Sequence, residues 1–132
     1  MPKQTLAELQ VEFTIHSFTP ETRPDARIFD QDIYFLAKTE DELSVVVPSS
    51  LELKSLDKES GWRCLEVMGP LNFSLTGILS GIAGALAEAS ISIFAISTFD
   101  TDYILVKKDS FAQAIAVLEK NDYKVNQLNK PQ

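Results

Sequence analysis

Two short polar stretches carry the side chains best suited to hold a small molecule. Residues 69–77 read Gly-Pro-Leu-Asn-Phe-Ser-Leu-Thr-Gly and stand before a segment with helical spacing. Asn72 or Ser74 can cap that helix, and the N–H groups of a first helical turn suit an anion such as a carboxylate. Asp100 and Asp102 follow an apolar run, where an aspartate can pair with an ammonium group. Together the two stretches offer the groups that a zwitterion needs.

Both aspartates also have simpler explanations. Asp is common in turns because its side chain bonds to its own backbone, and Asp100 and Asp102 fall between two strand-like runs. The 69–77 loop and this turn need not share an end of a sheet, in which case Asp102 would serve the ligand of another unit across an oligomer interface. Paired carboxylates can bind a divalent ion. Two acids without further ligands are a weak signal, so we expect no metal site.

The sequence offers little for catalysis. His16 is the only histidine, which excludes a His-based triad or a multi-His metal site within one chain, and its alternating strand pattern indicates a surface or packing residue. Cys64 is the only cysteine and falls in an expected strand, where a buried thiol is more common than a nucleophile. The 69–77 loop lacks the arginine cradle of an acylphosphatase. We therefore expect no enzyme, no catalytic residue and no cofactor.

The elements that must position these residues follow a βαββαβ order. Apolar side chains recur at helical spacing over 75–86, and two β-rich runs flank a short turn at Asp100, which is typical of a hairpin. The expected elements are a strand at 62–69, a helix at 74–89, hairpin strands at 91–99 and 102–107, a helix at 110–121 that stops at a left-handed Asn121, and a strand at 123–128. This order builds a four-stranded antiparallel sheet with two helices on one face, the ferredoxin-like arrangement of the α+β class.

Three glycines fall in the first expected helix, at positions 77, 81 and 84. Each glycine inside a helix costs about 1 kcal/mol relative to alanine. We expect a compensating close approach of a strand, a second helix or a ligand.

The first half of the chain repeats the pattern in a reduced form. A strand is expected at 11–18 and a hairpin at 33–47, joined by a proline-rich loop where the second half has a helix. Residues 54–61 are polar and are the best candidate for a linker, and the polar residues 1–8 are expected to fray. We interpret the chain as two related units, a degenerate and mostly β unit at 1–60 and a complete one at 61–132.

Composition argues against several classes of partner. The 132-residue chain carries 12 Lys and Arg against 19 Asp and Glu, a net charge of −7. Phosphate backbones and anionic lipid repel such a protein, so we expect neither nucleic acid nor a membrane as partner. No apolar run reaches the roughly 18 residues of a spanning helix, and the first residues lack the apolar core of a signal peptide. We expect a cytoplasmic protein.

Several of these motifs resemble a known family. The stretch 69–79 followed by 91–106, with Ser-Thr-Phe-Asp-Thr-Asp-Tyr at 97–103, closely resembles the ACT domains of small bacterial tandem-ACT proteins, which are similar to those of CASTOR-type arginine sensors. The resemblance also takes in residues 34–48 and 61–64. It implies a regulatory ACT fold that binds small molecules, usually amino acids, at interfaces between ACT units.

The resemblance also implies a binding site. At the matching positions, the loop and helix start would face the carboxylate of the ligand, and the second acid of the turn would reach its amino group. The implied ligand-binding residues are Asn72, Phe73, Ser74, Leu75, Thr98, Phe99 and Asp102. The first unit departs from the family pattern, because it lacks a recognisable first helix.

Two functions from different classes fit the sequence. One is a regulatory module that binds an amino acid or a close analogue. The other is a structural or interaction module that oligomerises and regulates a partner protein without a ligand. In either case we expect a homodimer or a higher homo-oligomer, because a small sheet covered by helices on one face needs a partner for its edges or its other face.

Burial is expected to follow the alternation of the hairpin and the spacing of the helices. The side chains expected inside are Leu79, Ile82, Leu86, Ile93, Ala95, Leu105, Ile115 and Leu118. The apolar side chains expected on the outer face are Phe94, Ile96, Ile104 and Val106.

Overall fold

The computed structural model describes residues 4–68 and 77–128, which fall into two compact units. Residues 11–62 form the first, called here the β unit. The described residues up to Gln10 and from Arg63 on form the second, called the helical unit. The segment before Val11 therefore belongs with the helical unit, although we placed it with the N-terminal unit. The two long strands β1 (Thr5–Phe18) and β4 (Asp57–Val67) contribute residues to both units.

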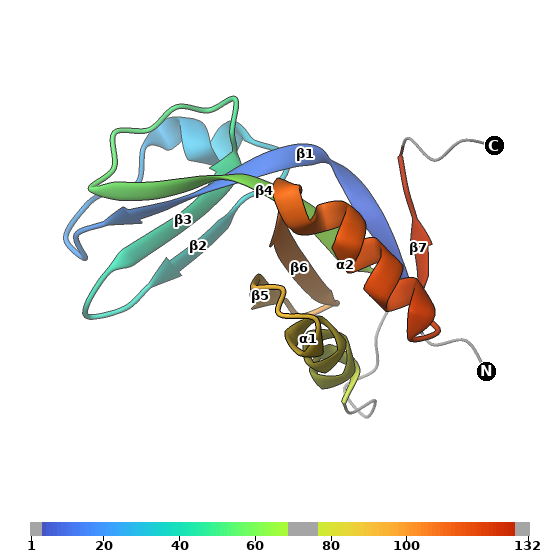
Figure 1. Ribbon diagram of the computed structural model, residues 1–132. Helices are drawn as coiled ribbons and strands as arrows, with labels where there is room; N and C mark the ends of the chain where they lie inside the picture. Colours follow the sequence, from blue (N-terminus) through green and yellow to red (C-terminus); the bar gives the residue numbers. More distant parts are fainter. Residues whose placement is uncertain (1–3, 69–76, 129–132) are drawn as a thin grey trace. The chain divides into compact units, whose positions relative to one another are not determined.

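The helical unit packs two helices on one face of a sheet (Figure 1). Besides parts of β1 and β4, it contains α1 (Ile78–Glu88), β5 (Ile93–Ser97), β6 (Asp102–Lys107), α2 (Lys108–Lys120) and β7 (Lys124–Asn126). The strand order is β7–β1–β4–β6–β5. Alternate residues of the strands and the inner faces of α1 and α2 share one core. The α+β, ferredoxin-like βαββαβ fold expected for this half is confirmed.

The N-terminal segment is a strand, although we expected it to fray. Its residues Thr5–Ala7 pair in parallel with β7, and the Thr5 carbonyl accepts a hydrogen bond from the Met68 N–H at 2.8 Å. Leu6 is fully buried in the core beneath the helices. The sheet of this unit therefore has a fifth strand, which lies between β4 and β7 in place of the direct pairing that a four-stranded sheet would have.

The hairpin of β5 and β6 buries a different set of side chains from the one we expected. Its antiparallel register pairs Ile93 with Val106 and Ala95 with Ile104, so these residues share a face. Ile104 and Val106 point into the helix-covered core, whereas Ala95 is exposed. The expected inward set combined residues from both faces of the hairpin. This register places odd-numbered residues of β5 on the same face as even-numbered residues of β6, whereas the expectation took odd-numbered residues from both strands.

The other expectations for the core hold in most cases. Five expected side chains are buried, namely Ile82, Leu86, Leu105, Ile115 and Leu118. Leu79 and Ile93 are half-buried against the same core. Leu105 is buried, but it lies on the sheet face opposite Ile104 and Val106.

The first helix starts later than the spacing predicted. It runs over Ile78–Glu88 rather than 74–89, and Gly77 precedes it with φ at +79°, a backbone conformation that favours glycine. Gly81 meets the close approach that we expected, since a Cβ there would lie 2.7 Å from the Tyr123 hydroxyl. Gly84 has no described atom within 4 Å of that position. The close contact therefore explains one of the two glycines within the helix.

The second helix matches its prediction except at the end. It buries the apolar stripe of Phe111, Ala114, Ile115 and Leu118. The left-handed residue after it is Asp122, with φ at +73°, whereas Asn121 keeps a negative φ. The Asn121 amide donates instead to the Val117 carbonyl at 2.8 Å, which satisfies one of the carbonyls that a helix leaves open at its C-terminus.

The β unit keeps the strand order of a ferredoxin-like sheet and lacks its α-helices. Its strands follow the order β2 (Phe35–Lys38), β3 (Leu43–Pro48), β1 and β4. A short 3-10 helix, η1 (Ala26–Asp30), stands where the first helix would be, and residues 49–56 connect β3 to β4 without a helix. The first unit is therefore degenerate, as expected. The expected linker at 54–61 is wrong for residues 57–61, which belong to β4.

His16 has a packing role in the β unit. It is 2% exposed, and its Nδ1 lies 2.8 Å from the Ser55 hydroxyl oxygen. Burial and the nearby charge of Lys58 lower the pKa of this imidazole below its ordinary value. The ring therefore holds the 49–56 connection against β1 in its neutral form at neutral pH.

Replacing the two glycines of α1 by alanine should have opposite effects. Gly84→Ala should stabilise the protein by about 1 kcal/mol through helix propensity alone. Gly81→Ala should destabilise it, because overpacking costs about 1–3 kcal/mol when a buried neighbour must move. Thermal unfolding should show a higher melting temperature for Gly84→Ala and a lower one for Gly81→Ala.

The Tyr123→Phe background is the control for this pair, since it removes the hydroxyl that the new Cβ would meet. In the Tyr123→Phe background, Gly81→Ala should lower the melting temperature by less than it does in the wild type. Equal gains from both alanines in the wild-type background would contradict the close contact.

Candidate functional site

The structure describes three of the seven expected binding residues. Thr98, Phe99 and Asp102 lie at the turn between β5 and β6. Asn72, Phe73, Ser74 and Leu75 lie outside the described residues, so their part in a site stays a prediction.

The β5–β6 turn is closed by hydrogen bonds between two threonines. The Thr98 N–H donates to the Thr101 carbonyl at 2.8 Å, and the Thr98 hydroxyl donates to the same carbonyl at 3.1 Å. The Thr101 N–H in turn donates to the Thr98 hydroxyl oxygen at 3.3 Å. The turn thus spans 98–101 rather than the two residues expected, and Ser97 pairs with Asp102 across the strands. This places Asp102 at the first position of β6.

Thr101 ties the turn to the end of β4. Its side chain is buried, with 7% exposed, and its hydroxyl donates to the Val67 carbonyl at 2.5 Å. Val67 is the last residue of β4, from which the chain continues toward residues 69–77. The turn and the end of β4 therefore lie at the same end of the sheet. Sequence reasoning treated Thr101 as a turn residue only, and the short polar side chain between two apolar strands was the available signal.

Asp102 has acceptor capacity that the fold does not use in the contacts described. Its Oδ1 accepts a hydrogen bond from the Ser97 hydroxyl at 2.5 Å, across the strand pair. The carboxylate is half-buried. An ionised carboxylate offers about four lone-pair sites, so Oδ2 can accept from an ammonium group while Ser97 fixes the rotamer. Turn chemistry alone does not explain this geometry, because the bond joins two strand residues.

A second polar pair lies on the opposite face of the sheet. The Tyr103 hydroxyl donates to Glu66 Oε2 at 3.4 Å, and burial together with the Glu66 charge raises the pKa of that phenol.

Cys64 is buried, and burial raises the pKa of its thiol to about 12. The thiol is therefore protonated at neutral pH and has little nucleophilic character.

Exposed apolar side chains stand at the same end of the helical unit as the turn. Phe99 is 81% exposed and Met68 is 45% exposed. Because Phe99 sits at the tip of the turn and Met68 follows β4, both flank the end where Asp102 begins β6. They offer apolar surface to a ligand or to another chain.

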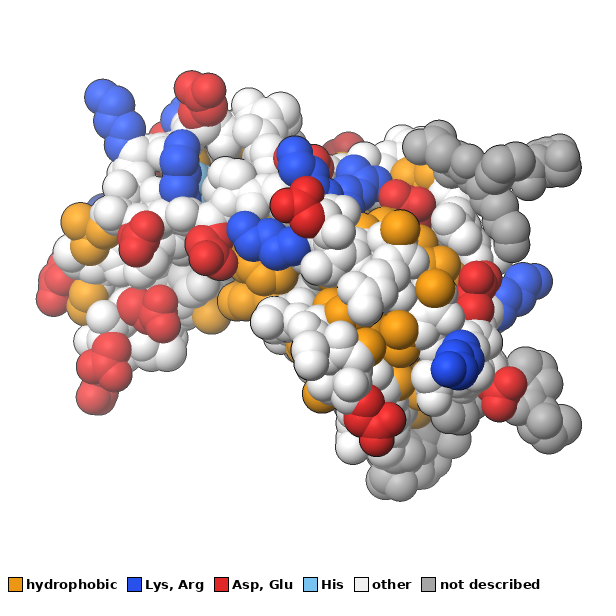
Figure 2. Space-filling view, in the orientation of Figure 1, with side chains coloured by type: hydrophobic (Ala, Val, Ile, Leu, Met, Phe, Trp, Pro, Cys, Tyr) orange, Lys and Arg blue, Asp and Glu red, His pale blue; other side chains and the backbone are white. Residues whose placement is uncertain are grey.

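Charged and metal-ligating side chains are spread over the described residues. No group of three or more His, Cys, Asp or Glu side chains is placed to hold a metal ion in the described ranges. On the face drawn in Figure 2, acidic and basic side chains are interspersed rather than gathered in a basic stripe. None of the described helices is long and apolar enough to cross a membrane.

A family model matches the part of the chain that contains both α-helices. Residues 57–120 match the model of the ACT domain family, so this segment of the chain is an ACT domain. The β4–α1–β5–β6–α2 succession of the helical unit falls within that segment. The ACT fold expected from the 69–79 and 91–106 motifs is therefore confirmed.

Curated relatives share the name "Cytosolic arginine sensor for mTORC1 subunit 1". The human protein is 35% identical over 131 residues, which cover 91% of this chain and 39% of that protein. The bovine protein is 45% identical over 74 residues, which cover 55% of this chain and 22% of that protein. The chain thus spans less than half the length of the curated relatives it matches.

Solved structures share the fold at low sequence identity. A protein from Agobacterium tumefaciens superposes with a TM-score of 0.89 at 24% identity, covering 100% of this chain and 98% of that one. The aspartate kinase from Synechocystis gives a TM-score of 0.69 at 14% identity and covers 98% of this chain and 28% of that one. At these identities the likeness concerns the fold.

Removing the Thr101 hydroxyl should loosen this end of the helical unit. Thr101→Val keeps the shape of the side chain and leaves the buried Val67 carbonyl without this donor, a loss of about 1–3 kcal/mol. Thr101→Ser keeps the hydroxyl and is the matched control. Chemical denaturation should show a lower free energy of unfolding for the valine variant than for the serine variant, and equal values would mean that the bond contributes nothing.

Proposed function

We propose that this chain is a regulatory ACT module without catalytic activity, and that its helical unit binds a free amino acid where β4 ends. The single observation that carries the proposal is the hydrogen bond from Thr101 to Val67. It fixes the turn with Asp102 at the end of the sheet from which the 69–77 loop departs. The observation supports a site in which residues 69–77 would bind the anionic group of the ligand and Asp102 its ammonium group.

The chemistry of this end suits a zwitterion. Asp102 supplies a carboxylate for the ammonium group, with Ser97 holding one of its oxygens. The first N–H groups of a helix lack intrahelical partners and carry partial positive charge, and α1 begins at Ile78 after the loop. Asn72, Phe73, Ser74 and Leu75 would complete the carboxylate side, and Thr98 and Phe99 would lie beside the ligand.

The relatives point to the ligand to test first. They are named as cytosolic arginine sensors, so arginine heads the series of amino acids. The likeness to an aspartate kinase has low sequence identity, so it adds only that the same fold occurs in that enzyme. The alternative is an interaction module that regulates a partner protein without a ligand.

A melting-temperature screen of the twenty amino acids separates the two functions. A ligand at 100 times its dissociation constant stabilises the fold by about 2.7 kcal/mol, which should raise the melting temperature by several degrees. Asp102→Ala should abolish that rise, because the ammonium group loses its partner. Asp100→Ala removes an acid from the same turn and should leave the rise unchanged.

Two outcomes would overturn parts of this proposal. If no amino acid at millimolar concentration moves the melting curve, the ligand-free interaction module replaces the sensor. If one amino acid stabilises the wild type and Asp102→Ala equally, the sensor stands and Asp102 is not the ammonium partner.

A further inference from the structure

The β unit contains a cavity of about 830 Å³ that the amino-acid site does not involve. All its lining residues fall between Phe18 and Lys58, within the β unit. One wall is the loop from β1 to η1, and the other is the 52–58 stretch that leads into β4. The cavity exists where a complete ACT unit would cover the sheet with helices, since here η1 has five residues and the 49–56 connection has no helix. Its volume is in the range of small-molecule sites.

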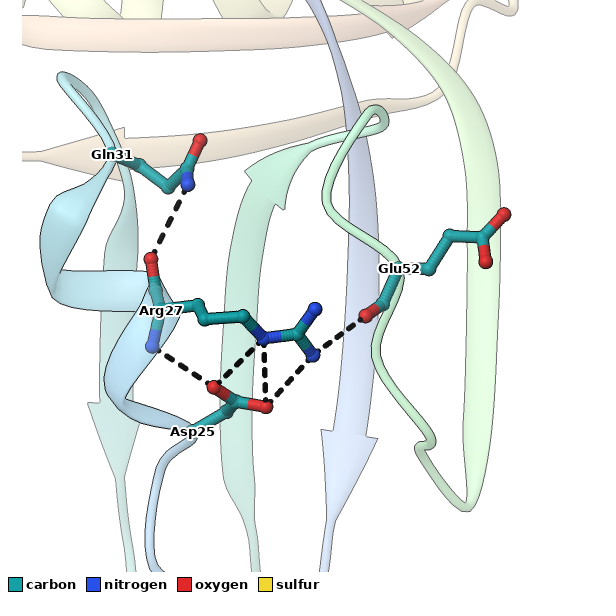
Figure 3. Close-up of polar contacts among 4 residues, drawn as sticks. All are labelled: Asp25, Arg27, Gln31 and Glu52. Carbon is teal, nitrogen blue, oxygen red and sulfur yellow. Dashed lines mark hydrogen bonds and ion pairs between the residues drawn. The ribbon is translucent and has the colours of Figure 1, made fainter.

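The two walls are joined by an arginine clamp (Figure 3). Arg27 donates to both carboxylate oxygens of Asp25, with Nη2–Oδ2 at 2.8 Å, and the same Nη2 donates to the Glu52 carbonyl oxygen at 3.2 Å. The Arg27 guanidinium holds the pKa of the Asp25 carboxyl at about 2, so the pair stays ionised at any physiological pH. The clamp connects the loop to the 52–58 stretch, and the charges of Arg27 and Asp25 cancel.

The charge that remains around the cavity is positive. Arg23, Lys54 and Lys58 line it, and none of the three forms an ion pair within the described part of the chain. Apart from the clamped Asp25, Glu52 is the only acid in the lining. Three cations against one remaining acid around this cavity contrast with the net charge of −7 of the whole chain.

The base of the cavity is apolar. Leu43 and Leu53 are buried in the core of the β unit, and Phe18 packs against the same core. Ser55 adds a hydroxyl that is fixed by His16 at 2.8 Å. The cavity thus combines an apolar floor with a cationic rim.

We propose that this cavity binds a small organic anion, a carboxylate carried on an apolar body such as an aromatic ring. The ring would lie on Leu43, Leu53 and Phe18, and the carboxylate would meet Arg23, Lys54 and Lys58. The site is independent of the amino-acid site, because it lies in the other unit and requires neither an ammonium group nor Asp102.

Saturation-transfer NMR with phenylacetate tests the proposal on the full chain. Phenylacetate should give a signal, and phenethylamine, which has the same ring and the opposite charge, should give a much weaker one. Lys54→Gln with Lys58→Gln should weaken phenylacetate binding about fivefold or more, since each exposed charge contact contributes up to ~1 kcal/mol. Lys38→Gln with Lys120→Gln makes the same change of net charge away from the cavity and should have no such effect.

Three results of these experiments would contradict the anion site. No phenylacetate signal, equal signals from the two probes, or equal losses in the two double variants would each overturn the proposal. Asp102→Ala should leave phenylacetate binding intact, so a failure of the amino-acid site and a failure of this one can be told apart.

Discussion

A single buried hydroxyl constrains one end of the helical unit. Val67 is the last residue of β4, and its carbonyl accepts a hydrogen bond from the buried Thr101 side chain in the β5–β6 turn. A buried carbonyl without a donor is costly, so this bond constrains where the β5–β6 turn can lie. With the turn fixed, Asp102 starts β6 beside the strand end from which the loop to α1 departs. The bond thereby places the residue before Asp102 against the last residue of β4.

The sequence predicted the helices and strands whose pattern of apolar and turn residues lies within the element itself. The buried stripe of α2 follows from its spacing of apolar residues, and the succession of elements follows from alternating patterns and turn signals. The residues at the N-terminus could not be assigned in this way, because their strand depends on pairing with β7, more than one hundred residues away in the chain. The same holds for residues 57–61, which are polar in sequence yet belong to β4.

The candidate site shows the same division between local and distant causes. Asp102 was identified from its motif, but its bond to Ser97 depends on a register that pattern reading did not determine. Ile104 and Val106 were placed on the wrong face for that reason. Thr101 was missed because its role arises from contact with a strand more than thirty residues earlier. The cavity of the β unit has no sequence motif, since its lining combines the loop before η1 with the 52–58 stretch, which lie apart in the sequence.

The central proposal is that a free amino acid binds at the Asp102 end of the helical unit. The most direct test is a titration of each amino acid into nitrogen-15-labelled protein, followed residue by residue through the backbone amide signals. We expect one amino acid to shift the amide signals of residues 97–103 and of the first turn of α1, while the amide signals of the β unit stay in place. Shifts confined to the β unit, or none for any amino acid, would contradict it.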